Sequence, residues 1–343
     1  MNTMKKTVHA LWAVFFVALL HSSCKPEVDL YADYKEIPVI YGLIDYTADT
    51  NFVRITRSIY VGNDNPSMVV QNPDSIFFPE KLDVRLVEYK NGEKTRELLL
   101  DTIHRMYYTA EKLCKNTKDD KYRYELRVVI NGKEIVSRAD LVGGTDFRLY
   151  TPHLNFSKLY FGMYRNFKFG PAENAAFYDI DVKFHFKERK MNTPDTIDRV
   201  FTVFGGRYYT ERLVYSYEEG KYNILYKPEY LYTSMGKYLG ADTLDKEVYR
   251  YITDYPLEVV IDAAGVDFMN YLTYYDPNVT NAQGIPPLNC VGEGAEGLFS
   301  SRARIRIRGR LAGNTLPDLL KNGWNFYYIG GNTTIDALEC ENY

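Results

Sequence analysis

Five arginines occupy every second position of one segment near the end of the chain. They are Arg302, Arg304, Arg306, Arg308 and Arg310, and Ala303, Ile305, Ile307, Gly309 and Leu311 lie between and after them. In a β-strand this period of two places the guanidinium groups on one face and the apolar residues on the other. Side chains two positions apart on one strand face are about 7 Å from each other, so five positive charges repel unless they have partners. We expect those partners to be acids of a neighbouring strand, such as Asp179 and Asp181, or else an anionic ligand such as a lipopolysaccharide phosphate or an acidic partner surface.

A second segment, residues 150–169, is rich in aromatic side chains. Tyr150, Phe156, Tyr160, Phe161, Tyr164, Phe167 and Phe169 are interleaved there with Lys158, Arg165 and Lys168. If Tyr160, Phe161 and Tyr164 are exposed, they can stack on sugar rings, insert among lipid headgroups or anchor a partner protein. If they are buried, they are core between two β units, which is the usual fate of large aromatic residues.

No motif carries recognisable catalytic chemistry. Residues 292–297 (GEGAEG) match the glycine pattern of dinucleotide-binding loops, but they follow two prolines and precede a predicted strand, so we interpret them as a turn. His104, His153 and His185 stand in no metal or nucleophile motif. We therefore expect a protein that is not an enzyme and uses no metal or cofactor. The alternative is a hydrolase whose two carboxylates are far apart in the sequence.

β structure must position these residues. Tyr and Phe, which favour strands, are abundant at 32 and 18 of 343 residues. Asn91-Gly92 and Asn131-Gly132 each separate two strand-like runs, which is the strongest short hairpin signal. We expect a mainly β chain with an immunoglobulin-like antiparallel sandwich at 37–149, a second β-rich domain at 150–312 and a C-terminal segment at 313–343. The second domain should carry a few short helices, including 242–252 and 265–275.

The N-terminus has the features of an export signal. Lys5 and Lys6 precede an apolar run at 10–20, which is too short to span a bilayer core of about 30 Å. The following residues, Leu20-His21-Ser22-Ser23-Cys24, resemble the lipobox of bacterial lipoproteins, although His21 stands where that motif has leucine. The resemblance implies a signal peptide at 1–23, acylation of Cys24 and a linker at 24–36. The alternative is an ordinary signal peptide followed by a free or disulfide-bonded cysteine.

Several segments together resemble an uncharacterised group of Bacteroidota lipoproteins that are often encoded beside TonB-dependent receptors. The segments are IPVIYGLIDY with NFVRITRSI, LEVVIDAAGVDFMNYL, and GEGAEGLFSSRARIRIRG. The resemblance implies an accessory role at the outer membrane. The acidic residues in Lys25-Pro26-Glu27-Val28-Asp29 resemble the signal that sends Bacteroidota lipoproteins to the outer leaflet, so we expect the lipid-anchored protein to be exposed at the cell surface. Separately, Ser75, Thr102, Thr196 and Thr243 lie in Asp-Ser/Thr-aliphatic tripeptides that resemble the acceptor of Bacteroidota protein O-glycosylation. A turn or helix cap at each tripeptide is the alternative.

Charge and cysteine content limit the partners. The net charge of −3 argues against a nucleic-acid binder, because such binding depends on neutralising phosphates. Beyond Cys24 there are Cys114, Cys290 and Cys340, which allow one internal disulfide whose pairing the sequence does not decide. We expect a non-enzymatic accessory subunit of an outer-membrane β-barrel complex. The alternative function is glycan binding for nutrient capture or adhesion.

Overall fold

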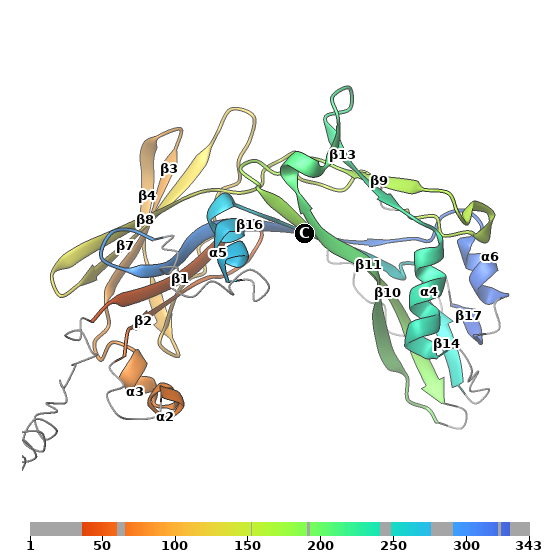
Figure 1. Cartoon of the computed structure of the whole chain (residues 1–343), viewed down its shortest axis with the longest axis horizontal. Coiled ribbons are helices and arrows are strands. Elements are labelled where there is room, and N and C mark those ends of the chain that lie inside the picture. Colours follow the sequence, from red (N-terminus) through yellow and green to blue (C-terminus); the bar gives the residue numbers. More distant parts are fainter. Residues whose placement is uncertain are drawn as a thin grey trace, which may run out of the picture. The chain divides into compact units, whose positions relative to one another are not determined.

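The structure, a computed structural model, describes residues 36–59, 66–151, 153–190, 193–240, 248–275, 291–321 and 324–329. The described residues from Ile37 onward belong to one unit, and Figure 1 labels many of its elements. Strands dominate and the helices are short, which confirms the prediction of a mainly β fold. In this part of the chain no helix is long and apolar enough to cross a membrane.

The main sheet contains ten strands among the described residues. Their order is β17-β14-β10-β15-β16-β1-β2-β6-β5, and β11 also pairs with β10. The bounds are β1 Pro38–Asp45, β2 Asn51–Arg57, β5 Asp101–Ile103, β6 Met106–Thr109, β10 Phe177–Lys190, β11 Ile197–Tyr209, β14 Val248–Ile252, β15 Leu257–Ala264, β16 Glu296–Gly309 and β17 Phe326–Tyr328. The neighbours are antiparallel except in the pairs β1 with β16 and β14 with β17, which are parallel.

Strand β16 joins the two segments that the sequence suggested as separate β domains. Its first half pairs with β1, where Val39 lies opposite Glu296 and Asp45 opposite Arg302. Its second half pairs with β15, from Arg302 opposite Ala264 to Gly309 opposite Leu257. One continuous sheet therefore contains strands from residues 37–149 and from residues 150–312.

Two smaller sheets cover different parts of the main sheet. One consists of β3 (Asp83–Lys90), β4 (Glu93–Leu99), β7 (Tyr122–Ile130) and β8 (Lys133–Asp140), and the other of β9 (Arg165–Phe169), β12 (Val214–Ser216) and β13 (Lys221–Tyr226). The four-stranded sheet and β1, β2 and β6 enclose one apolar core, as in a β-sandwich. The second core contains residues of β9, β10, β13 and β15.

The two Asn-Gly hairpins form as predicted. Asn91 and Gly92 connect β3 to β4, and Asn131 and Gly132 connect β7 to β8. All four residues have positive φ, between 51° and 89°, which is the conformation that a type I′ turn requires at both central positions.

The described helices are α2 (Pro66–Gln71), α3 (Pro73–Ile76), α4 (Glu229–Leu239), α5 (Val266–Tyr274) and α6 (Thr315–Leu320), with single 3₁₀ turns η1 (Lys158–Tyr160) and η2 (Thr210–Arg212). Helix α5 confirms the helix expected at 265–275. The helix expected at 242–252 is wrong over Val248–Ile252, which is strand β14 between β10 and β17. Pairing on both sides overrode the helical spacing there, since strand propensity depends on context. Helix α4 was not predicted, and it packs Leu231 and Met235 into the second core.

Candidate functional site

One face of the main sheet is polar across the three neighbouring strands β10, β15 and β16. Alternate residues of β10, from Tyr178 to Phe186, point into the second core, and the intervening residues point to the opposite side. We call this opposite side the charged face. It carries Asp179, Asp181, Lys183, His185, Lys187 and Arg189 on β10, Glu258 and Asp262 on β15, and Arg302, Arg304, Arg306 and Arg308 on β16.

Three of the five predicted arginines have acidic partners within the protein. Arg304 forms two hydrogen bonds to Asp262, with its Nε 2.6 Å and its Nη2 2.9 Å from the two carboxylate oxygens. Arg302 lies 3.3 Å from a carboxylate oxygen of Asp45, and Arg306 lies 3.2 Å from one of Glu258. Arg310 instead donates to the hydroxyl of Tyr255 over 3.0 Å.

The acids come from β15 and β1, whereas the sequence pointed to β10. Strand β15 lies between β10 and β16, so Asp179 is one strand too far from the arginines. Asp179 binds Arg207 of β11 through two hydrogen bonds of 2.8 and 2.7 Å. Asp181 is exposed, beside Gly205 of β11 and near the charge of Arg304. Strand order therefore decided which carboxylates balance the arginines.

Glu258 is the centre of the other half of the charged face. Its carboxylate lies 2.8 Å from Nε2 of His185 and 3.2 Å from Nε of Arg306. The hydrogen bond to His185, together with the positive charges of Arg308 and Arg306, lowers the pKa of Glu258 to about 2 against the opposing effect of burial. Lys183 and Arg308 lie directly opposite Glu258 on the two neighbouring strands.

The aromatic segment is partly core and partly surface. Phe156, Phe167 and Phe169 are fully buried in the second core, as expected if the aromatic residues of this segment form core. Between them lies an exposed stretch, residues 159–164, which we call the apolar turn. Its exposed side chains are Leu159 (69% exposed), Phe161 (41%), Met163 (57%) and Tyr164 (60%). Tyr160 is half-buried, and the guanidinium of Arg165 lies 3.4 Å from the centre of its ring.

The apolar turn has a defined backbone. The N–H of Met163 donates to the carbonyl of Tyr160 over 2.9 Å. Phe161 has φ −56° and ψ 137°, and Gly162 has φ 78°, which together indicate a type II turn with glycine at the position that needs positive φ. The N–H of Gly162 also donates to the carboxylate of Glu229, the first residue of α4. Phe161 packs edge-on against Tyr232 of the same helix.

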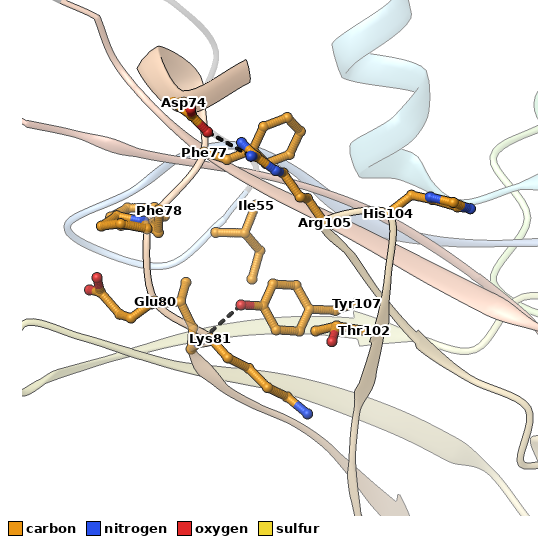
Figure 2. A pocket seen from close by; sticks show the side chains of 12 residues that line it. Ile55, Asp74, Phe77, Phe78, Glu80, Lys81, Thr102, His104, Arg105 and Tyr107 are labelled. Carbon is orange, nitrogen blue, oxygen red and sulfur yellow. Dashed lines mark hydrogen bonds and ion pairs between the residues drawn. The ribbon is translucent and has the colours of Figure 1, made fainter. Parts of the chain in front are cut away.

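Figure 2 shows a shallow pocket beside the β5–β6 hairpin. It encloses about 390 Å³, with Ile55 and Tyr107 at its centre and the ion pair of Asp74 and Arg105 at one end. The hydroxyl of Tyr107 accepts a hydrogen bond from the N–H of Leu82 over 2.8 Å. Asp74 is neutralised by Arg105 and the Tyr107 hydroxyl is engaged, while Glu80, Lys81 and His104 also line the pocket.

The predicted modification residues are scattered over the surface. Ser75 lies in α3, Thr102 lies in β5 and lines the pocket, and Thr196 lies just before β11. Thr243 and the predicted lipidation residue Cys24 are outside the described residues, as are Cys290 and Cys340. Cys114 is a half-buried free thiol, and burial raises its pKa.

The glycine pattern at 292–297 has a structural role. A Cβ at Gly292 would lie 2.1 Å from the carbonyl oxygen of Val136, and one at Gly297 would lie 2.1 Å from that of Ile40. These glycines therefore let the chain approach β8 and β1, and the segment leads into strand β16, as the turn interpretation requires. Among the described residues no group of three or more His, Cys, Asp or Glu side chains is placed to hold a metal ion.

Sequence reasoning missed a set of residues at the far end of the charged face. Lys187 and Arg189 of β10 lie opposite Tyr251 and Tyr249 of β14, and Tyr327 of β17 lies opposite Tyr251. The alternation of basic and aromatic residues at 183–190 was a visible signal, but the tyrosines fell in a segment predicted as helix. No known family model and no curated protein matches the sequence.

Proposed function

We propose that this chain is a lipid-anchored, non-enzymatic accessory subunit that docks on an outer-membrane β-barrel protein through the apolar turn. The observation that carries the proposal is the exposure of Leu159, Phe161, Met163 and Tyr164 next to one another. Large apolar side chains that stay together in water mark interaction sites, whereas isolated ones need no explanation. Fully burying one such side chain against a partner contributes about 1.5–3 kcal/mol.

Contacts within the protein fix the conformation of the apolar turn. Gly162 provides the turn conformation, Glu229 binds its N–H, and Tyr232 supports the ring of Phe161. A partner that binds a rigid turn does not have to order it, so more of the contact energy is retained as affinity.

The surroundings of the apolar turn favour an acidic partner. The ammonium of Lys227 lies 5.3 Å from the centre of the Tyr164 ring, and that of Lys158 lies 5.3 Å from the centre of the Tyr232 ring. Arg165 adds a third positive charge above Tyr160. Acidic groups around an apolar socket on the partner would complement this arrangement and speed association.

The anchor is inferred from the sequence. Acylation of Cys24 would hold the protein at a membrane, since each buried CH₂ contributes about 0.8 kcal/mol and several chains act together. The described residues from Ile37 onward can then be exposed on the membrane surface. Anchoring confines the chain near barrel proteins, so a modest docking surface is enough for stable association.

Site-specific photo-crosslinking in the native envelope tests the proposal. A photoreactive residue at position 161 should form an adduct with an outer-membrane β-barrel protein, identified by mass spectrometry. The matched control places the same residue at Leu99, which is 65% exposed at the end of β4. Phe161→Ser with Tyr164→Ser should abolish co-purification of that barrel. Identical adducts from both positions, or unchanged co-purification of the variant, would refute docking through the apolar turn.

A further inference from the structure

We propose that the charged face of the main sheet holds a binding site for an acidic polysaccharide, separate from the apolar turn. The site consists of a basic row, Lys183, Lys187 and Arg189 of β10 with Arg306 and Arg308 of β16, and of the neighbouring tyrosines Tyr249, Tyr251 and Tyr327. All of them lie on the same side of the sheet by strand register.

The two halves of the charged face differ in charge balance. In the first half each arginine has its own acid: Arg302 has Asp45, Arg304 has Asp262, and Arg207 has Asp179. Asp181 adds a further negative charge there. This half therefore offers no excess of positive charge to an anion.

The second half has more positive groups than acids. Glu258 is contacted by His185 and Arg306, and Lys183 and Arg308 lie opposite it on the flanking strands. The side chains of Lys183 and Arg308 form no hydrogen bond or close ion pair with another described residue, although the charge of Arg308 acts on Glu258. Strand β15 separates Lys183 from Arg308, so the single carboxylate of Glu258 faces Lys183, Arg306 and Arg308 together, and a bound anion would balance the positive charge that this carboxylate leaves over.

Tyrosines continue the basic row. The guanidinium of Arg189 lies 6.0 Å from the ring centre of Tyr249 and 5.5 Å from that of Tyr251. The Tyr327 ring, 46% exposed, lies 5.7 Å from Tyr249 and 6.2 Å from Tyr251. Beside them the Lys187 ammonium lies 3.5 Å from a carboxylate oxygen of Asp198. Aromatic faces beside hydrogen-bond donors suit sugar rings, which have both apolar and hydroxyl-bearing surfaces.

The geometry selects a long ligand. The span from Lys183 to Arg189 is six residues of strand, about 20 Å at about 3.3 Å per residue. A single phosphate or sulfate could contact only one end of this row. A chain that carries repeated acidic groups and sugar rings could contact Arg308 and Lys183 at one end and the tyrosines at the other.

An acidic polysaccharide fits better than a nucleic acid. Nucleic-acid binding surfaces are strongly basic because phosphate neutralisation drives affinity. Here the net charge of the chain is −3, and Asp179 and Asp181 lie on the same face of the sheet. The basic row is thus a local strip on an acidic protein.

Titration of the full-length protein with dextran sulfate, neutral dextran of equal length and single-stranded poly(dT) tests this site. We expect dextran sulfate to bind, with an affinity that falls as salt rises, and neutral dextran to bind at least about ten-fold more weakly. Lys183→Gln with Arg308→Gln should weaken dextran sulfate binding by about ten-fold or more, because neither side chain holds an internal ion pair. Tyr249→Leu with Tyr251→Leu should weaken it by about three-fold or more.

The control removes the same charge elsewhere. Lys133→Gln with Lys237→Gln, on β8 and α4, should change binding by less than about two-fold. Equal losses in this control and in the Lys183/Arg308 variant would overturn the site in favour of general attraction by charge. Tighter binding of poly(dT) than of dextran sulfate would overturn the ligand class. The Phe161→Ser/Tyr164→Ser variant should bind dextran sulfate normally, so failure of docking and failure of this site are distinguishable.

Discussion

Replacing Glu258 with glutamine removes the carboxylate that lies among His185, Arg306, Arg308 and Lys183. The Glu258 side chain is only 9% exposed, and these basic residues surround its carboxylate. Glutamine keeps the shape and a carbonyl oxygen but loses the negative charge. We predict that Glu258→Gln lowers the free energy of unfolding and, at the same time, strengthens dextran sulfate binding.

The magnitude follows from the pKa of Glu258. Its fall from 4.5 to about 2 corresponds to about 3 kcal/mol at full strength, since one pKa unit is about 1.4 kcal/mol. The network lies on an open face of the sheet, where solvent weakens ion pairs, so we expect a loss of about 1–2 kcal/mol. The same change removes the negative charge beside Lys183, Arg306 and Arg308, so affinity for dextran sulfate should rise by about three-fold or more.

The pH dependence has a defined sign. A carboxylate whose pKa is lower in the folded protein stabilises the fold above its unfolded pKa, here 4.5, and this contribution is lost as the pH falls toward about 2. Urea unfolding of the wild-type protein and the variant should therefore show the full difference at about pH 7 and a shrinking difference below about pH 4.5.

Two results would refute this reasoning. A difference in unfolding free energy below about 0.5 kcal/mol at about pH 7 would show that Glu258 is not a structural counter-ion. A difference that stays constant down to about pH 3 would show that its charge is irrelevant. Glu134→Gln is the control, because Glu134 is half-exposed and lies 4.0 Å from Arg127, so it should change stability by less than about 0.5 kcal/mol.

Three further predictions concern the fold. Gly236→Ala in α4 should raise the unfolding free energy by about 0.5–1 kcal/mol in urea titrations, because no atom lies within 4 Å of the added Cβ. Gly170→Ala should prevent native folding, because its Cβ would lie 1.8 Å from a backbone oxygen, and equal stability of the two variants would contradict this packing. Asn116→Ala should lower stability by about 3 kcal/mol, since the buried amide serves three backbone groups, and a loss below about 1 kcal/mol would argue against this role. Cys114 should react with a thiol reagent far more slowly in the native protein than in urea, because burial raises its pKa; equal rates would refute its shielding.

Local signals in the sequence were sufficient for the hairpins and for several elements. Asn91-Gly92 and Asn131-Gly132 form turns because their conformational requirement is contained in two residues. Helix α5 follows its spacing in the same way. Helix α4 was missed because tyrosines and Gly236 are poor helix formers, and its stability comes from Leu231 and Met235 packing into the second core.

The candidate binding surfaces, like helix α4, could not be predicted from local sequence signals alone. Period two identified the arginines of β16 as one face, but only strand order brought Asp262 and Glu258 beside them and left Asp179 to Arg207. The apolar turn lies between residues that are buried, so its exposure could not be read from the aromatic content of the segment. Tyr249 and Tyr251 joined the charged face only when the segment formed strand β14.

By itself the sequence determined the mainly β class, the positions of the tight turns and the two-faced character of β16, because each depends on residues close together in the chain. The tertiary structure decided that β16 joins two cores, which acids balance which arginines and which aromatic residues remain in water. These outcomes depend on contacts between residues far apart in sequence, such as Arg302 with Asp45, whose free energy exists only after the sheet has formed. Charge pairing and exposure are therefore properties of strand order, which no local pattern encodes.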